Sequence, residues 1–305
     1  MVWDAVIFDL GGVVLDWQPE RAFEQVMPSE LVPAFMERIG FHEWNRANDA
    51  RDSLAEAEEE LVRRFPSDAH GIRGYRRHFV HSVTAMVPGT SAVIAELAAT
   101  GVTVSALTNW SGEMFALARP RFGVLGRFRD IVVSGREGMV KPDPAIYRLA
   151  CARLGVEPSR AVFIDDSEAN VAIARQVGLA GLAFTSPTQL RDDLAGLGLL
   201  GAREPLTVPT YHWAVRREWL HALDTGTWPW SGRGLGYDAE GFVHLSFDHQ
   251  LARTRARFYA DLEDDDVVLL RLDPAADLPI VVEDGFPHLF APLPLDRVVQ
   301  ASAPA

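Results

Sequence analysis

Short apolar runs alternate with segments of helical period over most of the first 200 residues. Residues 3–9 (WDAVIFD) form an apolar run that ends in an acid and is followed by two glycines, which indicates a buried strand and a loop. Further strands are predicted by the runs VTVSALTN, DIVVS, AVFIDD and LAGLAF, each separated from the next by a helical segment. Strands that alternate with helices in this way are typical of a doubly wound, parallel α/β sheet.

A long insertion interrupts this alternation after its first strand. From Glu20 to about Thr84 the chain is charged, amphipathic and helical in period, with Pro28 and Pro66 as breaks. We therefore expect a helical cap at residues 17–85, inserted into a core domain made of residues 1–16 and 86–200.

A different pattern follows the segment GAREPLTVP, which has no periodic face and which we interpret as a linker near residues 200–208. Beyond it, strands are predicted by TYHWAV, GFVHLSF, VVLLRLD, PIVVED and, more weakly, DRVVQ. Helices are predicted by REWLHALDTG and HQLARTRARFY. This mixture predicts a compact α+β domain at residues 208–305.

Composition limits the setting in which the protein works. The chain is 48% hydrophobic, it begins without a basic segment, and its apolar runs are too short to span a membrane, so we expect a cytoplasmic protein without membrane contact. A formal charge of −13 disfavours nucleic acid as a partner, because the phosphate backbone requires clustered cations. The single cysteine, Cys151, excludes an internal disulfide, and its apolar helical surroundings favour simple packing.

Four predicted strand ends carry polar residues. They are Asp9, Thr108 with Asn109, Lys141 after the third strand and its loop, and Asp165 with Asp166. Ligands in open α/β sheets bind at the carboxyl ends of the strands, so we expect these side chains to meet. A strand-tip carboxylate can attack phosphorus, clustered carboxylates bind Mg²⁺, and hydroxyl or amide groups can donate to phosphoryl oxygens. Any one of these residues alone is equally well explained as a loop or helix cap.

The stretch GMVKPDP contains the only lysine among the 29 Lys and Arg residues of the chain. An ammonium is a compact point charge, which fits between a nucleophilic carboxylate and a phosphoryl group where the planar fork of arginine does not. Lys141 is therefore the predicted charge stabiliser. A surface lysine left by drift is the alternative.

These motifs resemble those of the haloacid dehalogenase superfamily. The segments VIFDLGGVVLD, ALTN, VKPDPAIY and VFIDDSEAN are similar to its four ordered motifs over about residues 1–200, particularly in its glucose-1-phosphatase-like and epoxide hydrolase N-terminal phosphatase-like members. The resemblance implies a cap that closes over substrate and a Mg²⁺-dependent phosphatase acting on a small phosphorylated metabolite through an aspartyl-phosphate intermediate. By position, it implies Asp9 as nucleophile and metal ligand, Thr108 and Asn109 as phosphate binders, Lys141 as charge stabiliser, Asp166 as metal ligand, and Asp165 and Asn170 as supporting residues.

Gly11 departs from the pattern of the family's phosphatases, which usually have an aspartate there as general acid. Its backbone carbonyl is still available to the metal. Loss of a general acid costs ~10²- to 10⁴-fold, least for weakly basic leaving groups, so we expect anomeric sugar, acyl or aryl phosphates as substrates. The sequence does not show which residue replaces the acid.

Two other functions remain open for the core. The 2-haloacid dehalogenases of the superfamily also lack this acid, but they usually have an aromatic residue in place of Gly11 and lack paired acids such as Asp165 and Asp166. The second alternative is a catalytically retired core that binds a phosphorylated ligand, with the activity or a partner contact in the C-terminal domain; intact Asp9, Lys141 and Asp166 argue against it. In the cap, FHEWNRANDARDS offers four residues that could meet a substrate, although an ordinary helical surface has the same mixture. They are His42, Trp44, Arg46 and Asp49.

Residues 209–300 resemble a family catalogued as domain of unknown function 952, through TYHWA, EGFVHLSFDHQ and FPHLF. A more distant resemblance, to the ADP-ribosyltransferase fold, implies that His212 and Ser246 line a cleft for NAD or ADP-ribose, with His244 and His288 nearby. Core histidines hydrogen-bonded to the backbone are the alternative for His212 and His244. The domain is thus expected to be a second enzyme, a nucleotide-binding module or a partner-binding module.

Overall fold

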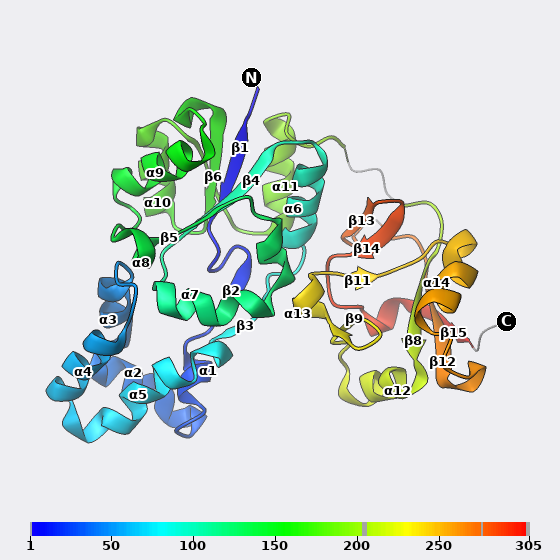
Figure 1. The fold of residues 1–305 in the computed structure, drawn as a ribbon, viewed down its shortest axis with the longest axis horizontal. Coiled ribbons are helices and arrows are strands. Elements are labelled where there is room, and N and C mark those ends of the chain that lie inside the picture. The colour runs from blue at the N-terminus through cyan, green and yellow to red at the C-terminus, as the bar shows by residue number, and fades with distance from the viewer. Residues whose placement is uncertain (1, 203–205, 276, 303–305) are drawn as a thin grey trace.

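Figure 1 shows the computed structural model of the chain, which describes residues 2–202, 206–275 and 277–302. The chain forms an α/β core, a helical cap and a C-terminal domain built on antiparallel strands. Part of the predicted linker, residues 203–205, lies outside the described residues, as do the outermost ends of the two predicted domains.

The core is a parallel five-stranded sheet with the order β5-β4-β1-β6-β7, as the sequence pattern predicts. Its strands are β1 (Ala5–Phe8), β4 (Thr103–Thr108), β5 (Ile131–Val133), β6 (Ala161–Asp165) and β7 (Ala180–Ala183). Central strand β1 pairs Phe8 with Ala106 on one side and with Ile164 on the other. The carboxyl ends of β4, β1 and β6 therefore lie next to one another.

Helices cover both faces of this sheet (Figure 1). They are α6 (Thr90–Ala99), α7 (Gly112–Ala118), α8 (Ser134–Glu137), α9 (Pro144–Leu154), α10 (Glu168–Val177) and α11 (Pro187–Gly196). Val6 and Phe8 of β1 pack in one cluster with apolar residues of α6 and α11, while Ala5 and Ile7 pack in another with α9 and α10. Burial on both faces explains why this strand is an unbroken apolar run rather than an alternating one.

The insertion is helical, as expected, with α1 (Glu20–Phe23), α2 (Val32–Ile39), α3 (Phe41–Asn48), α4 (Ala55–Arg64) and α5 (Ala69–Arg77). Its core contains the aromatic cluster Phe23, Phe41 and Tyr75, with ring centroids 4.7–5.5 Å apart. Two short antiparallel strands, β2 (Leu15–Trp17) and β3 (Val83–Met86), join the cap to the core. These two strands are not predicted by the hydrophobic pattern of the sequence.

The C-terminal domain is α+β, as expected. Its strands are β8 (Thr210–Val215), β9 (Trp230–Gly232), β10 (Leu235–Gly236), β11 (Val243–His244), β12 (Val267–Leu272), β13 (Ile280–Glu283), β14 (Phe286–Leu289) and β15 (Val298–Ser302), and its helices are α12 (Arg216–Thr225), α13 (Tyr237–Glu240) and α14 (Leu251–Phe258). The strands form the sheets β15-β12-β8, β11-β14-β13 and β10-β9. The predicted strand GFVHLSF is shorter than expected, because Ser246 leaves β14 and forms a bridge to Tyr211 instead.

The C-terminal domain packs against the core through Arg127, whose guanidinium donates to the two carboxylate oxygens of Glu283 at 2.7 and 3.0 Å. The same guanidinium lies 5.8 and 5.2 Å from the ring centroids of Phe242 and Phe290. The backbone amide of Gly89 also donates to the carbonyl of Phe290. Among the described helices, none is both long and apolar enough to cross a membrane.

Candidate active site

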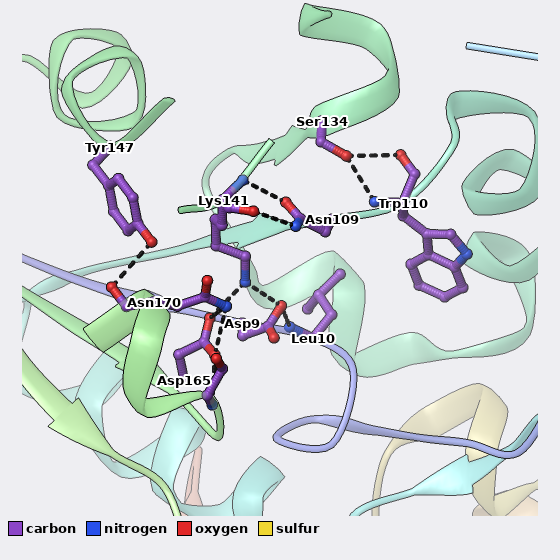
Figure 2. Close-up of polar contacts among 10 residues, drawn as sticks. Asp9, Leu10, Asn109, Trp110, Ser134, Lys141, Tyr147, Asp165 and Asn170 are labelled. Atoms are coloured by element: carbon purple, nitrogen blue, oxygen red, sulfur yellow. Dashed lines mark hydrogen bonds and ion pairs between the residues drawn. The ribbon is translucent and has the colours of Figure 1, made fainter. Parts of the chain in front are cut away.

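The polar strand ends converge at the carboxyl edge of the core sheet, as Figure 2 shows. Lys141 lies between two carboxylates: its Nζ is 2.8 Å from Oδ1 of Asp9, after β1, and 2.6 Å from Oδ2 of Asp165, at the end of β6. Asp9 is 8% exposed, Lys141 4% and Asp165 0%. Lys141 is therefore not a surface lysine, and its ammonium is shared by two buried acids.

Hydrogen bonds from neighbouring residues hold Asp9 and Lys141 in place. Leu10 donates its amide to Oδ1 of Asp9, at 2.7 Å. The Asn109 side chain brackets the backbone of Lys141, accepting from its amide at 2.8 Å and donating to its carbonyl at 2.9 Å (Figure 2). Asn109 thus positions Lys141, while its phosphate contact stays a prediction. Thr108, which ends β4, is buried beside it.

Asp165 is fixed by the start of the following helix. The amide of Ser167 donates to Oδ1 at 2.8 Å, and the Asn170 side chain donates to both oxygens, at 3.0 and 3.1 Å. Asn170 is itself held where its carbonyl accepts from the Tyr147 hydroxyl at 3.0 Å (Figure 2). Asp165 therefore orients Lys141, and Asn170 orients Asp165.

Three carboxylates at this edge are close enough to hold a metal ion. Asp9, Asp165 and Asp166 each offer an oxygen that lies within 4.8 Å of the others. Asp166 is exposed, and its carboxylate lies against Gly12, where a Cβ would be only 2.5 Å from Oδ2. Oxygen donors of this kind suit Mg²⁺, so the residues present fit the expected cofactor.

The charge balance supports the same conclusion. Burial raises the pKa of Asp9 to about 7; the charge of Lys141 opposes this effect, and the charge of Asp165 adds to it. For Lys141, burial alone would lower the pKa, but the charges of the two acids raise it above its usual value. Burial and the charge of Asp165 also raise the pKa of Asp166. One ammonium among three carboxylates leaves a negative site that a divalent cation would neutralise.

A cavity of about 130 Å³ lies above this edge, between the core and the cap. Its core side includes Gly11, Thr108 and Asn109, and its cap side includes Asp49 and Tyr75. Asp49 is thus the member of the four cap candidates that faces the cavity. His42 and Arg46 are exposed and do not line the cavity, and the Trp44 indole donates to the carbonyl of Ala57. Tyr75, Asn45 and Trp17, which also line the cavity, were not predicted.

Three of the four candidate residues of the C-terminal domain line one cavity. His212, His244 and Ser246 line a cavity of about 190 Å³ in the C-terminal domain. His212 is buried, its Nδ1 lies 2.7 Å from the carbonyl of His244, and burial lowers its pKa to about 4, which is the arrangement of a core histidine. His288 does not line this cavity, but it lies next to His244, with ring centroids 5.4 Å apart, and its Nδ1 is 3.0 Å from Glu283 at the contact with the core. The NAD or ADP-ribose ligand stays a prediction.

Residues 3–178 match the family model of the haloacid dehalogenase-like hydrolases. The chain belongs to this family. It is a hydrolase of the haloacid dehalogenase superfamily, and its residues 214–301 match DUF952, a protein family of unknown function. Both family resemblances indicated by the sequence motifs are confirmed, whereas the likeness to the ADP-ribosyltransferase fold stays a prediction.

Several curated proteins are similar in sequence to this hydrolase. It is 29% identical to acyl-CoA dehydrogenase family member 10 of Mus musculus, over 90% of this chain and 26% of that protein. It is 31% identical to flavin mononucleotide hydrolase 1 of Arabidopsis thaliana (47% and 58%) and 29% identical to a phosphoglycolate phosphatase of Cupriavidus necator (57% and 78%). The matched part is thus about a quarter of the mouse protein and somewhat over half of the Arabidopsis one.

Solved structures of the superfamily also resemble this hydrolase. A family enzyme of Bacteroides thetaiotaomicron, in complex with magnesium and inorganic phosphate, aligns with a TM-score of 0.46 and 18% identity, over 60% of this chain and 95% of that one. The L-2-haloacid dehalogenase of Xanthobacter autotrophicus aligns with a TM-score of 0.45 and 21% identity, over 66% and 85%.

Proposed function

We propose that this hydrolase is a Mg²⁺-dependent phosphatase that removes the phosphoryl group of a small metabolite through an aspartyl-phosphate intermediate. The observation that carries the proposal is the buried ammonium of Lys141 shared by Asp9 and Asp165, with Asp166 within reach of the same metal ion. The curated phosphatase relatives support the same reaction class.

The contacts of Asp9 indicate which of its oxygens attacks. The amide of Leu10 and the ammonium of Lys141 both bind Oδ1. In the described part of the chain, Oδ2 has no such partner, so it is the oxygen free to form the bond to phosphorus. Because Lys141 stays beside Oδ1, its charge also lies next to the phosphoryl oxygens as negative charge develops on them.

The metal site follows from the same edge. Mg²⁺ would be held by the carboxylates of Asp9 and Asp166 and by the carbonyl of Gly11, and it supplies charge neutralisation and orientation for the transferring phosphoryl group. Thr108 and the amide of Asn109 are the proposed donors to its remaining oxygens. Metal-free dehalogenation has no need of three carboxylates within 4.8 Å of one another, and this argues for phosphoryl transfer.

The test is phosphate release from a panel of phosphomonoesters, with Mg²⁺ and with EDTA. We expect Mg²⁺-dependent release that is lost in Asp9→Asn, and a phosphorylated Asp9 trapped by rapid acid quench. Chloride release from 2-chloropropionate without metal would replace the phosphatase by a dehalogenase. Tight binding of a phosphorylated ligand without turnover in either assay would support the retired core instead.

A further inference from the structure

The cap places one acidic residue against the cavity at the strand ends. Asp49 follows α3 and lines the cavity that Gly11 and Thr108 line from the other side. Its carbonyl accepts a hydrogen bond from the hydroxyl of Ser134 at 2.6 Å, and that hydroxyl accepts from the amide of Trp110 at 2.8 Å. Ser134 is fully buried in the core, so this contact fixes the backbone of Asp49 to the core next to the strand ends.

The chain that follows Asp49 is also docked on the core. The carbonyl of Asp52 accepts from the amide of Glu113 at 2.7 Å, and the Glu113 carboxylate accepts from Ser53 at 2.8 Å. Two core glycines permit this approach: a Cβ at Gly112 or at Gly135 would clash with the docked segment. The position of Asp49 over the site is therefore determined by several contacts on both sides of the cap–core boundary.

The carboxylate itself is half-buried, and within the described residues no donor forms a hydrogen bond with it. Four charged or titratable groups face it. They are Asp9 after β1, Lys141 in the core loop, Arg46 on α3 and Tyr75 on α5. Burial and the charge of Asp9 raise the pKa of Asp49 to about 7, against Lys141 and Arg46. Such a carboxyl is partly protonated at neutral pH, which is the range in which a general acid works best.

Position 11 opens into the same space. A Cβ atom on Gly11 would meet no described atom within 4 Å, and the φ of Gly11 is outside the left-handed region. The room that an acidic side chain would take at position 11 is therefore free, and it adjoins the cavity into which Asp49 projects from the cap.

We propose that Asp49 of the cap is the general acid of this hydrolase and takes the place of the acid that position 11 lacks. In the first step, Oδ2 of Asp9 forms a bond to phosphorus, the bond from phosphorus to the leaving oxygen breaks, and the Asp49 carboxyl gives its proton to that oxygen, releasing an alcohol. In the second step, the Asp49 carboxylate takes a proton from the water that attacks phosphorus. The bond between phosphorus and Oδ2 of Asp9 breaks and its electron pair returns to the Asp9 carboxylate, so phosphate leaves and both Asp9 and the protonated Asp49 are restored.

This inference rests on the proposed phosphatase function and changes its expected substrates. With Asp49 as the acid, alkyl phosphates are substrates as well, and the restriction to good leaving groups expected from Gly11 applies only when Asp49 is removed. The discriminating quantity is kcat/KM, because it reports the steps up to release of the alcohol.

The experiment compares ethyl phosphate, whose leaving alkoxide needs a proton, with p-nitrophenyl phosphate, whose leaving group does not. For Asp49→Asn we expect kcat/KM to fall ~10²- to 10⁴-fold on ethyl phosphate, and less than ~10-fold on p-nitrophenyl phosphate. The alkaline limb of the wild-type pH profile on ethyl phosphate should disappear in this variant. Asp68→Asn, which changes a cap acid paired with Arg38 at the surface, should leave both rates unchanged.

A second variant tests the role by rescue. Adding Gly11→Asp to Asp49→Asn should recover ethyl phosphate hydrolysis, because the new carboxyl enters the same cavity. An equal loss on both substrates, or no loss on either, would overturn the role of Asp49 while leaving the phosphatase intact. Absence of Mg²⁺-dependent hydrolysis of p-nitrophenyl phosphate by the wild-type protein would reject the phosphatase itself and the inference with it.

Discussion

Replacing Asp9 by asparagine should abolish hydrolysis and, at the same time, stabilise the metal-free fold above neutral pH. Asp9 and Asp165 share the single ammonium of Lys141, at 2.8 and 2.6 Å, so one negative charge in a buried cluster has no partner. Asparagine has nearly the same shape as aspartate and removes this charge. The ion pair between Lys141 and Asp165 is retained.

The size of the effect follows from the pKa of Asp9, which burial raises from 3.8 to about 7. A carboxyl with a raised pKa binds protons more readily in the folded than in the unfolded chain. The free energy of unfolding is therefore unaffected below about pH 4, falls as the pH rises towards 7, and stays low above it. The whole shift corresponds to about 4 kcal/mol, of which about 2–3 kcal/mol falls between pH 5 and pH 8.

The assay is urea unfolding in EDTA at pH 5 and pH 8, for wild type and Asp9→Asn. The stability of the variant relative to wild type should rise by at least about 2–3 kcal/mol between the two pH values, because the variant lacks the titration of Asp9. Loss of the charge of Asp9 also lowers the pKa of Asp49, which acts in the same direction. Added Mg²⁺ should stabilise wild type more than the variant. Asp68→Asn is the control. The hydrogen bond with Arg38 lowers the pKa of Asp68, so Asp68 titrates below pH 5 and its removal should not change the stability difference between pH 5 and pH 8. A variant less stable than wild type at pH 8, or an equal difference at both pH values, would refute the reasoning.

Three further substitutions test the site and the domain contact. Lys141→Arg keeps the charge but does not fit the 4% exposed position between two acids, so kcat should fall by ~10²-fold or more, and wild-type activity would contradict this expectation. Gly12→Ala, with φ +74° and a Cβ 2.5 Å from Oδ2 of Asp166, the proposed metal ligand, should raise the Mg²⁺ concentration for half-maximal activity ~10-fold. Gly101→Ala, with φ +84° and open space, should leave that concentration unchanged. Arg127→Ala should lower the free energy of unfolding by about 1–3 kcal/mol. Arg73→Ala, which breaks an exposed ion pair, should lower it by less than about 1 kcal/mol. Equal losses in urea unfolding would argue that the contact between the C-terminal domain and the core is not stabilising.

The polar strand ends could be predicted because their positions follow from the sheet alone. Once β1, β4 and β6 are recognised as buried parallel strands, the residues after Phe8, Leu107 and Ile164 must lie at one edge. The lysine adds a compositional signal, since the remaining basic residues of the chain are arginines. The packing of the helices does not affect which residues lie at this edge.

The cap side of the cavity could not be derived in the same way. Which face of α3 and α5 meets the core depends on packing between elements far apart in the chain, so nothing in FHEWNRANDARDS separates Asp49 from its three polar and aromatic neighbours. Strands β2 and β3 were missed because they have three and four residues and pair only with each other. In the C-terminal domain, the run GFVHLSF pairs with strands of two different sheets. Its apolar pattern therefore predicts one long strand, whereas the strand that forms is short.

The central position of β1 also sets the order in which the molecule is assembled. This strand is synthesised before its two neighbours, which begin only at Thr103 and Ala161, so it stays unpaired while the entire cap is made. The cap helices contact one another locally and are free to fold during that interval. Asp9 can meet Asp165 only when β6 pairs with β1, and β6 is synthesised after β4 and β5. The two carboxylates therefore repel each other only after the strands synthesised before β6 are available to form the apolar sheet that stabilises the core.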